Sequence, residues 1–156
     1  MLIFPQPASE DDDNGFTLIE LLVVMIIIGI LASIAIPVFL SQRAKAQDAA
    51  AKADVSTLGK EIATYWVDGT TAPTIAIVSG RYQVAGNDAG KVTNNVQLNT
   101  AFGAGAATGA TSYTSTGMTA TAWCVEVYNA SGSQKTYKFS ATAGLQAGQC
   151  TSNTAP

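Results

Sequence analysis

The chain of 156 residues contains no histidine, and its only two cysteines, Cys124 and Cys150, lie far apart in the sequence. Because structural metal sites usually need closely spaced cysteine or histidine ligands, we expect no metal and no cofactor. Without histidine, and with 11 scattered acidic residues, no general acid and base pair is evident, and we expect no enzymatic activity. Eight scattered lysine and arginine residues do not predict a nucleic-acid surface.

Charge is also missing from a long apolar run that ends at Leu40. Residues 21–40 carry no charged side chain, and as a helix they would cross roughly 30 Å of hydrocarbon. Glu20 directly precedes this stretch, where a carboxylate in lipid costs on the order of 2.5 to 3.5 kcal/mol. A cost of this size indicates that the carboxylate has a partner.

The stretch GFTLIE at residues 15–20 resembles the signature of the type IV prepilins, the family of type IV pilins and pseudopilins. The resemblance implies that a dedicated prepilin peptidase cleaves after Gly15. It also implies that Phe16 becomes the N-methylated amino terminus. In this family the glutamate that matches Glu20 pairs with the amine of a neighbouring subunit during assembly. The resemblance covers about residues 15–45 and indicates little about the rest of the chain.

Two residues inside the apolar run extend the same resemblance. Gly29 and Pro37 lie where the helix of this family is usually interrupted. Glycine costs a helix about 1 kcal/mol relative to alanine, and proline costs about 3 kcal/mol. The resemblance implies that the segment between them loses helical order in an assembled filament, whereas many membrane helices simply tolerate both residue types.

The residues before the run differ from a secretory signal peptide, which has a basic start and a cleavage site after its apolar core. Cleavage after Gly15 would leave the apolar run on the mature chain and create an amine at Phe16, four residues from Glu20. The leader contains four acidic and no basic residues, so cleavage changes the formal charge from −3 to +1. The alternative is an ordinary signal anchor whose Glu20 side chain reaches the membrane surface.

Basic residues flank the run on one side only. Arg43, Lys45 and Lys52 follow it, and none precedes it. By the positive-inside rule, this asymmetry would place the carboxyl-terminal part in the cytoplasm. The prepilin resemblance and the cysteine pair favour an exported globular part instead, and we predict that orientation. The acidic leader departs from the family, whose leaders usually carry lysine or arginine.

Beyond Leu40 the helix is expected to continue to about residue 67 in amphipathic form, because no turn signal interrupts it. One face is lined by apolar residues at spacings of three, four and seven: Ala44, Ala51, Val55, Leu58, Ile62 and Tyr65. Asp48 is expected on the exposed face, in weak ion pairs with Lys45 and Lys52. Asp68-Gly69 followed by Pro73 is typical of a helix end.

After Pro73 the apolar period becomes that of strands. We predict a small antiparallel sheet of three to five strands, packed on the 55–66 face of the helix. The expected strands are residues 74–78, 81–85, 92–98, 122–128 and 136–141, with a hairpin turn at 129–133. Residues 99–121 are nearly all Gly, Ala, Thr and Ser and are expected to form a loop, either an O-glycosylated surface or a solvated linker.

An even pair of cysteines in an exported domain favours a disulfide between Cys124 and Cys150. It would resemble the disulfide-bounded surface loop of many pilins. Closing the loop from Cys124 to Cys150 contributes roughly 3.5 kcal/mol to the stability of the domain in the chain-entropy model.

Three smaller patterns have ordinary explanations. The N-glycosylation sequon at Asn129 arises by chance in a turn of this composition. Residues 87–88 are expected to form a turn rather than a cation site. Tyr65 and Trp66 are expected to contact the sheet as core residues rather than to form an electron-conducting stack.

Together these patterns predict an α+β fold. Residues 1–15 form a prepilin leader, 16–40 the membrane-spanning and assembly half of a long helix, and 41–67 its amphipathic half. Residues 74–156 form a globular β domain that includes the loop at 99–121.

The predicted function is that of a structural subunit of an extracellular type IV pilus-like filament, or fimbrium, on the cell surface. The partners implied are copies of the chain itself, the prepilin peptidase, the pilus assembly machinery and the cytoplasmic membrane that holds the single-span precursor. One alternative is a pseudopilin or minor pilin of a type II secretion or DNA-uptake machine. Another is a monomeric, membrane-anchored binding module.

Overall fold

A computed structural model describes residues 16–99, 112–114 and 117–151. The leader, including the expected cleavage residue Gly15, and most of the expected loop at 99–121 lie outside the described residues. The chain divides into two compact units, Met1–Val38 and Phe39–Pro156.

One helix, α1 (Leu18–Asp68), contributes to both units. It starts directly after Thr17, and Pro37 lies inside it without ending it. At its carboxyl end, the backbone N–H of Gly69 donates to the carbonyl oxygen of Tyr65 at 2.8 Å, and Pro73 follows soon after. The predicted helix over residues 16–67 is therefore confirmed, with small differences at its ends.

In the second unit, α1 presents one buried stripe to the strands. Ala51, Val55, Leu58 and Ile62 have no exposed surface, and their spacing of three and four residues places them on one face of the helix. Burying a valine, leucine or isoleucine side chain contributes about 1.5 to 3 kcal/mol. Tyr65 and Trp66 pack against this core while remaining partly exposed, as predicted.

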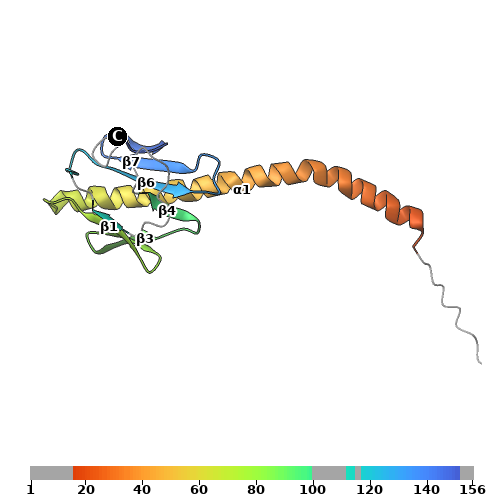
Figure 1. The fold of residues 1–156 in the computed structure, drawn as a ribbon, viewed down its shortest axis with the longest axis horizontal. Coiled ribbons are helices and arrows are strands. Elements are labelled where there is room, and N and C mark those ends of the chain that lie inside the picture. Colours follow the sequence, from red (N-terminus) through yellow and green to blue (C-terminus); the bar gives the residue numbers. More distant parts are fainter. Residues whose placement is uncertain (1–15, 100–111, 115–116, 152–156) are drawn as a thin grey trace, which may run out of the picture. The chain divides into compact units, whose positions relative to one another are not determined.

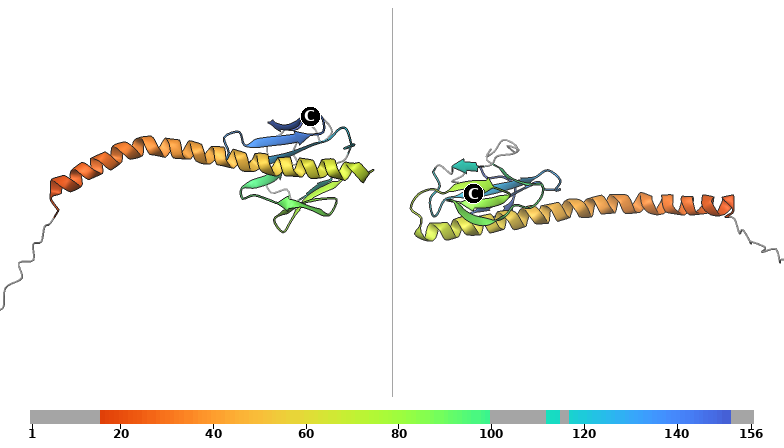
Figure 2. Two further views of the ribbon diagram at one scale, coloured as in Figure 1. Left: turned by 180° about the vertical axis from the view of Figure 1, so that it is seen from behind. Right: turned by 90° about the horizontal axis from the view of Figure 1, so that it is seen from below.

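Two four-stranded antiparallel sheets cover the stripe, and Figure 2 shows both on the same side of α1 in the view from below. The first has the order β3-β2-β1-β5 and consists of β1 (Thr74–Val78), β2 (Arg81–Val84), β3 (Asn87–Lys91) and β5 (Ser112–Thr114). The second has the order β4-β6-β7-β8 and consists of β4 (Val96–Asn99), β6 (Cys124–Asn129), β7 (Thr136–Ser140) and β8 (Gly144–Ala147) (Figure 1). The α+β class is confirmed.

The prediction of one sheet with three to five strands is wrong, because three further short strands, β3, β5 and β8, complete two sheets. β3 begins at Asn87, where a turn was expected. Its backbone hydrogen bonds come from antiparallel pairing with β2 in a hairpin. Ala85 and Gly86 have φ values of 51° and 83°, so they form the two-residue turn between these strands. β8 pairs in the same way with β7, and β5 lies inside the segment expected to be a loop.

A buried aspartate on α1 fastens the first sheet and the β3–β4 connection to the helix. The Asp54 carboxylate accepts hydrogen bonds from the Tyr82 hydroxyl at 3.1 Å, the Thr93 backbone N–H at 2.8 Å and the Thr93 hydroxyl at 2.6 Å. Burial raises the pKa of Tyr82 well above its ordinary value, and the nearby Asp54 charge raises it further. Asp54 therefore joins three chain segments through neutral donors.

The prediction that Asp48 lies on the exposed face in ion pairs is wrong. Asp48 is only 8% exposed, and its carboxylate accepts a hydrogen bond from the Gln134 backbone N–H at 3.1 Å in the β6–β7 turn. Lys52 instead lies over the Tyr137 ring, with Nζ 5.1 Å from the ring centroid. Helical spacing places Asp48 near both lysines. Spacing alone does not show whether Asp48 lies on the buried or on the exposed face of the helix.

The side chain of Asn129, in the sequon at the predicted hairpin turn, forms hydrogen bonds within the fold. Asn129 has no exposed surface, and its side-chain amide donates to the backbone oxygen of Gln47 at 3.2 Å and to its side-chain oxygen at 2.9 Å. The Ser131 backbone N–H donates back to the Asn129 side chain at 3.1 Å. The amide nitrogen that glycosylation would modify is therefore engaged inside the fold.

Candidate functional site

The described part of the first unit starts with a capping box formed by Thr17 and Glu20. The Thr17 hydroxyl and backbone N–H both donate to the Glu20 carboxylate, at 2.6 and 2.8 Å, and the Glu20 backbone N–H approaches the Thr17 hydroxyl oxygen at 3.3 Å. In this arrangement each side chain accepts a hydrogen bond from the other residue's backbone N–H at the helix start, and the Glu20 N–H also donates to the Thr17 carbonyl oxygen at 3.1 Å.

This contact supplies a partner for Glu20 that the sequence reasoning missed. The signal was present, because threonine followed three residues later by glutamate before an apolar run is typical of a capping box. The carboxylate accepts from neutral donors, so its charge is hydrogen-bonded but not neutralised. Glu20 therefore remains able to pair with a cation.

The helix surface that follows is apolar on all sides. Every leucine, isoleucine, valine, methionine and phenylalanine from Leu18 to Leu40 is at least 46% exposed. The apolar part of α1 has a mean hydropathy of 3.0 and is long enough to cross a membrane, and none of its side chains is buried in the fold. A helix that is apolar all round needs either lipid or other helices around it.

Gly29 and Pro37 both lie within regular helix in the first unit. A side chain at Gly29 would meet no atom within 4 Å, so this glycine is not required for packing inside the described chain. Between them, the Ser33 hydroxyl donates to the Ile30 carbonyl oxygen at 2.7 Å, a contact that satisfies a polar side chain in an apolar segment. The flexibility expected of this segment stays a prediction.

The second unit holds the cysteine pair. Cys124 and Cys150 form a disulfide with a Cα–Cα distance of 6.0 Å, and both residues are fully buried. Cys124 is the first residue of β6, and Cys150 follows β8, so the disulfide joins the chain beyond the second sheet to one of its two inner strands. The predicted pairing is confirmed.

A buried carboxylate lies beside this disulfide. Glu126, two residues after Cys124 on β6, has no exposed surface, and its carboxylate accepts hydrogen bonds from the Cys150 backbone N–H at 2.5 Å and from the Asn99 side-chain amide. Lys138 is its cross-strand neighbour on β7. Burial raises the pKa of Glu126 to about 6, although both hydrogen bonds and the Lys138 charge act in the opposite direction.

We call the second unit, Phe39–Pro156, the head. The raised pKa of Glu126 predicts that the head is more stable in mild acid. The folded state binds the Glu126 proton more tightly than the unfolded chain does, so this contribution is complete below about pH 4.5 and is lost as pH rises through about 6. We expect the free energy of unfolding to fall by about 2 kcal/mol across this window. Urea unfolding of the full chain and of Glu126→Gln, at pH 4.5 and 7, would measure it. An equal pH dependence in both proteins would contradict the assignment.

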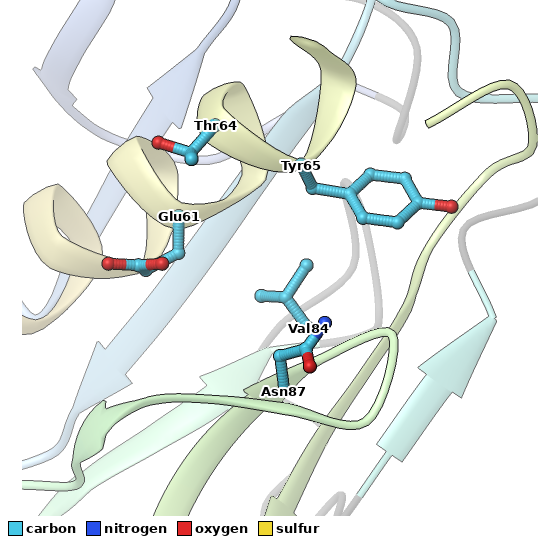
Figure 3. A pocket seen from close by; sticks show the side chains of 5 residues that line it. All are labelled: Glu61, Thr64, Tyr65, Val84 and Asn87. Atoms are coloured by element: carbon cyan, nitrogen blue, oxygen red, sulfur yellow. The ribbon is translucent and has the colours of Figure 1, made fainter. Parts of the chain in front are cut away.

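The hollow in Figure 3 lies between α1 and the β2–β3 hairpin and is lined by Glu61, Thr64, Tyr65, Val84 and Asn87. Its volume of ≈ 120 Å³ is well below the roughly 300 to 1,000 Å³ of small-molecule sites. The Tyr65 ring points its hydroxyl away from Glu61 in Figure 3, and that hydroxyl donates to the Thr71 carbonyl oxygen at 2.9 Å. Across the described residues, no group of three or more histidine, cysteine, aspartate or glutamate side chains could hold a metal.

The apolar segment also matches a known family model. Residues 12–36 match the prokaryotic N-terminal methylation motif, which takes in Gly15, Phe16 and Glu20. The amino-terminal segment is a prepilin segment. The resemblance to type IV pilins and pseudopilins is therefore confirmed, and the capping box lies at the start of the prepilin helix.

The curated proteins similar to this chain fall into two groups, type II secretion proteins and pilin or fimbrial proteins. The type II secretion system core protein G of Escherichia coli (strain K12) is 38% identical over 66 residues, which are 42% of this chain and 46% of the relative. A fimbrial protein of Pseudomonas aeruginosa is 39% identical over 92 residues, 48% of this chain and 60% of the relative. The type IV major pilin protein PilA of Myxococcus xanthus is 50% identical over 46 residues, 30% of this chain and 21% of the relative.

The chain spans less than half the length of the secretion-system relatives it matches. No solved structure matches the chain. The match to the methylation motif covers residues 12–36 alone, and the head is described from its own contacts.

The structure places the predicted site residues in two separate groups. Phe16, Glu20 and Gly29 lie within the matched residues 12–36, Pro37 directly follows them, and the two bonded cysteines belong to the head. Sequence reasoning missed Asp54 and Glu126, because their donors lie at least 24 residues away along the chain and no short motif joins them.

Proposed function

We propose that the chain is the precursor of a structural subunit of an extracellular type IV pilus-like filament. Cleavage after Gly15 frees the amine of Phe16, and the apolar half of α1 moves from the cytoplasmic membrane into a filament of copies of itself. The prepilin peptidase and an assembly machinery act on it, and the subunit itself is structural rather than catalytic.

The observation that carries this proposal is the match of residues 12–36 to the methylation motif on a helix whose apolar side chains are exposed all round. Such a surface needs lipid before assembly and neighbouring helices afterwards. Phe16, 84% exposed at the start of this surface, is accessible for modification once the leader is removed.

Replacing Gly15 by Leu tests the processing step. We expect a membrane-bound precursor about 15 residues longer than the mature subunit and no fibres, because the peptidase needs a small side chain before the cut. Mass spectrometry of the membrane fraction, and electron microscopy of material sheared from cells, would measure both outcomes. Normally processed subunit from this variant would refute cleavage after Gly15.

A pseudopilin of a type II secretion machine is the second candidate, favoured by the matches to core protein G in several species. The two functions differ in where the filament is found. Long fibres of this subunit in sheared surface material support the pilin, whereas a secretion defect on deletion, with no such fibres, supports the pseudopilin. A normal membrane pool with neither outcome supports the monomeric anchored module.

A further inference from the structure

The exposed charges on α1 just after the apolar run are all basic. Between residues 41 and 60 the only acidic residues are Asp48 and Asp54, and both are buried and bonded to neutral donors. Arg43 and Lys45 are exposed. The burial of the two aspartates therefore leaves this part of the helix surface with uncompensated positive charge.

The β6–β7 turn adds another cation at the same level of the helix. Lys45 lies one helical turn before Asp48, and the exposed Lys135 directly follows Gln134, whose backbone N–H donates to Asp48 at 3.1 Å. Neither lysine forms an ion pair within the described residues, where the one salt bridge joins Arg81 and Asp88. Lys45 and Lys135 thus flank a single contact between α1 and the turn.

This group of cations lies close to the end of the apolar run along the helix. With a rise of about 1.5 Å per residue, Arg43 and Lys45 are about 5 to 8 Å beyond Leu40, and Asp48 is about 12 Å beyond it. The headgroup layer of a bilayer is roughly 5 to 8 Å thick on each side. The side chains of Arg43 and Lys45 fall within that layer. Lys135, at the level of Asp48, can reach the outer edge of the layer with its long side chain.

We propose that Arg43, Lys45 and Lys135 form a basic collar that binds the phosphate groups of anionic phospholipids where α1 leaves the bilayer. The proposal rests on the membrane-inserted precursor described under the proposed function. Guanidinium and ammonium groups bind phosphate readily, and each basic residue at an anionic surface adds to the attraction. The collar holds the β6–β7 turn at the membrane until the subunit is extracted.

The test uses the full chain, one copy per nanodisc, in discs of phosphatidylcholine alone or with added phosphatidylglycerol. Hydrogen exchange of the peptide covering the β6–β7 turn is the readout. We expect slower exchange in the anionic discs at low salt, and loss of this protection at high salt. The double variant Lys45→Gln, Lys135→Gln should lose about fivefold in protection for each charge removed.

The matched control is Lys60→Gln, Lys91→Gln, which removes two exposed lysines that do not belong to the collar. It should keep full protection in anionic discs. Exchange of each variant in phosphatidylcholine discs gives the baseline for any change in the turn itself. Equal protection in both lipids, or protection that survives Lys45→Gln, Lys135→Gln, overturns the collar.

Elution of the protein with the disc is measured first. Failure to insert contradicts both the membrane-spanning precursor and the collar. Insertion with no lipid-dependent protection contradicts the collar alone.

Discussion

Replacing Glu20 by Val should stop filament assembly while a normal pool of inserted, disulfide-bonded subunit remains in the membrane. Removing a carboxylate from the edge of the span makes insertion easier by up to about 3 kcal/mol. In a filament, the same change would leave the amine of a neighbouring Phe16 unpaired in an apolar core, where breaking a buried pair costs roughly 3 to 5 kcal/mol. Electron microscopy of sheared material and blots of the membrane fraction would measure both effects.

Glu20→Gln separates the two roles of this side chain. A glutamine can still accept hydrogen bonds from Thr17, so the helix start remains capped, but the charge is gone. We expect no filaments from this variant either. Abundant fibres from Glu20→Val would refute the pairing, and fibres from Glu20→Gln alone would assign the requirement to the cap.

Asp54→Ala should lower the free energy of unfolding of the head by about 3 kcal/mol or more. The change leaves three donors without their acceptor, including the buried Tyr82 hydroxyl, and an unsatisfied buried group costs about 1 to 3 kcal/mol. The total free energy of unfolding of a small domain is roughly 5 to 15 kcal/mol, so this loss is large. Urea unfolding of the full chain in detergent, followed by tryptophan fluorescence, would measure it.

Asp68→Ala is the matched control on the same helix, because Asp68 is exposed at the end of α1. Its effect should stay within about 0.5 kcal/mol. Equal destabilisation by the two substitutions would mean that Asp54 contributes helix propensity or charge rather than the three hydrogen bonds.

The helix was predictable because its signals are local. The uncharged run, the apolar spacing from Ala51 to Ile62 and the stop at Gly69 are all visible within a few turns, and α1 follows them closely. The disulfide was predictable because the chain has only one cysteine pair. The capping box at Thr17 was equally local and could have been found by the same reasoning.

The division of the strands into two sheets and the burial of the acids depend on contacts that sequence spacing does not show. β3 is rich in residues that favour turns, and β8 contains no β-branched or aromatic residue. Both form strands because a neighbouring strand supplies hydrogen bonds. Asp48 looks like a surface residue in any helical pattern, until the β6–β7 turn covers it. Tertiary contacts therefore determine that β3 and β8 are strands and that Asp48 is buried, and local propensity does not.

The disulfide also determines what a protease can do to the head. Cys124 and Cys150 enclose both the β6–β7 turn and the exposed residues 141–143 between β7 and β8. A single cut in either turn leaves two fragments that remain covalently joined, so the nicked chain keeps every strand attached to α1. If the chain forms the proposed filament, a subunit cut once in this region would stay in the fibre, and the cut would become visible only after reduction.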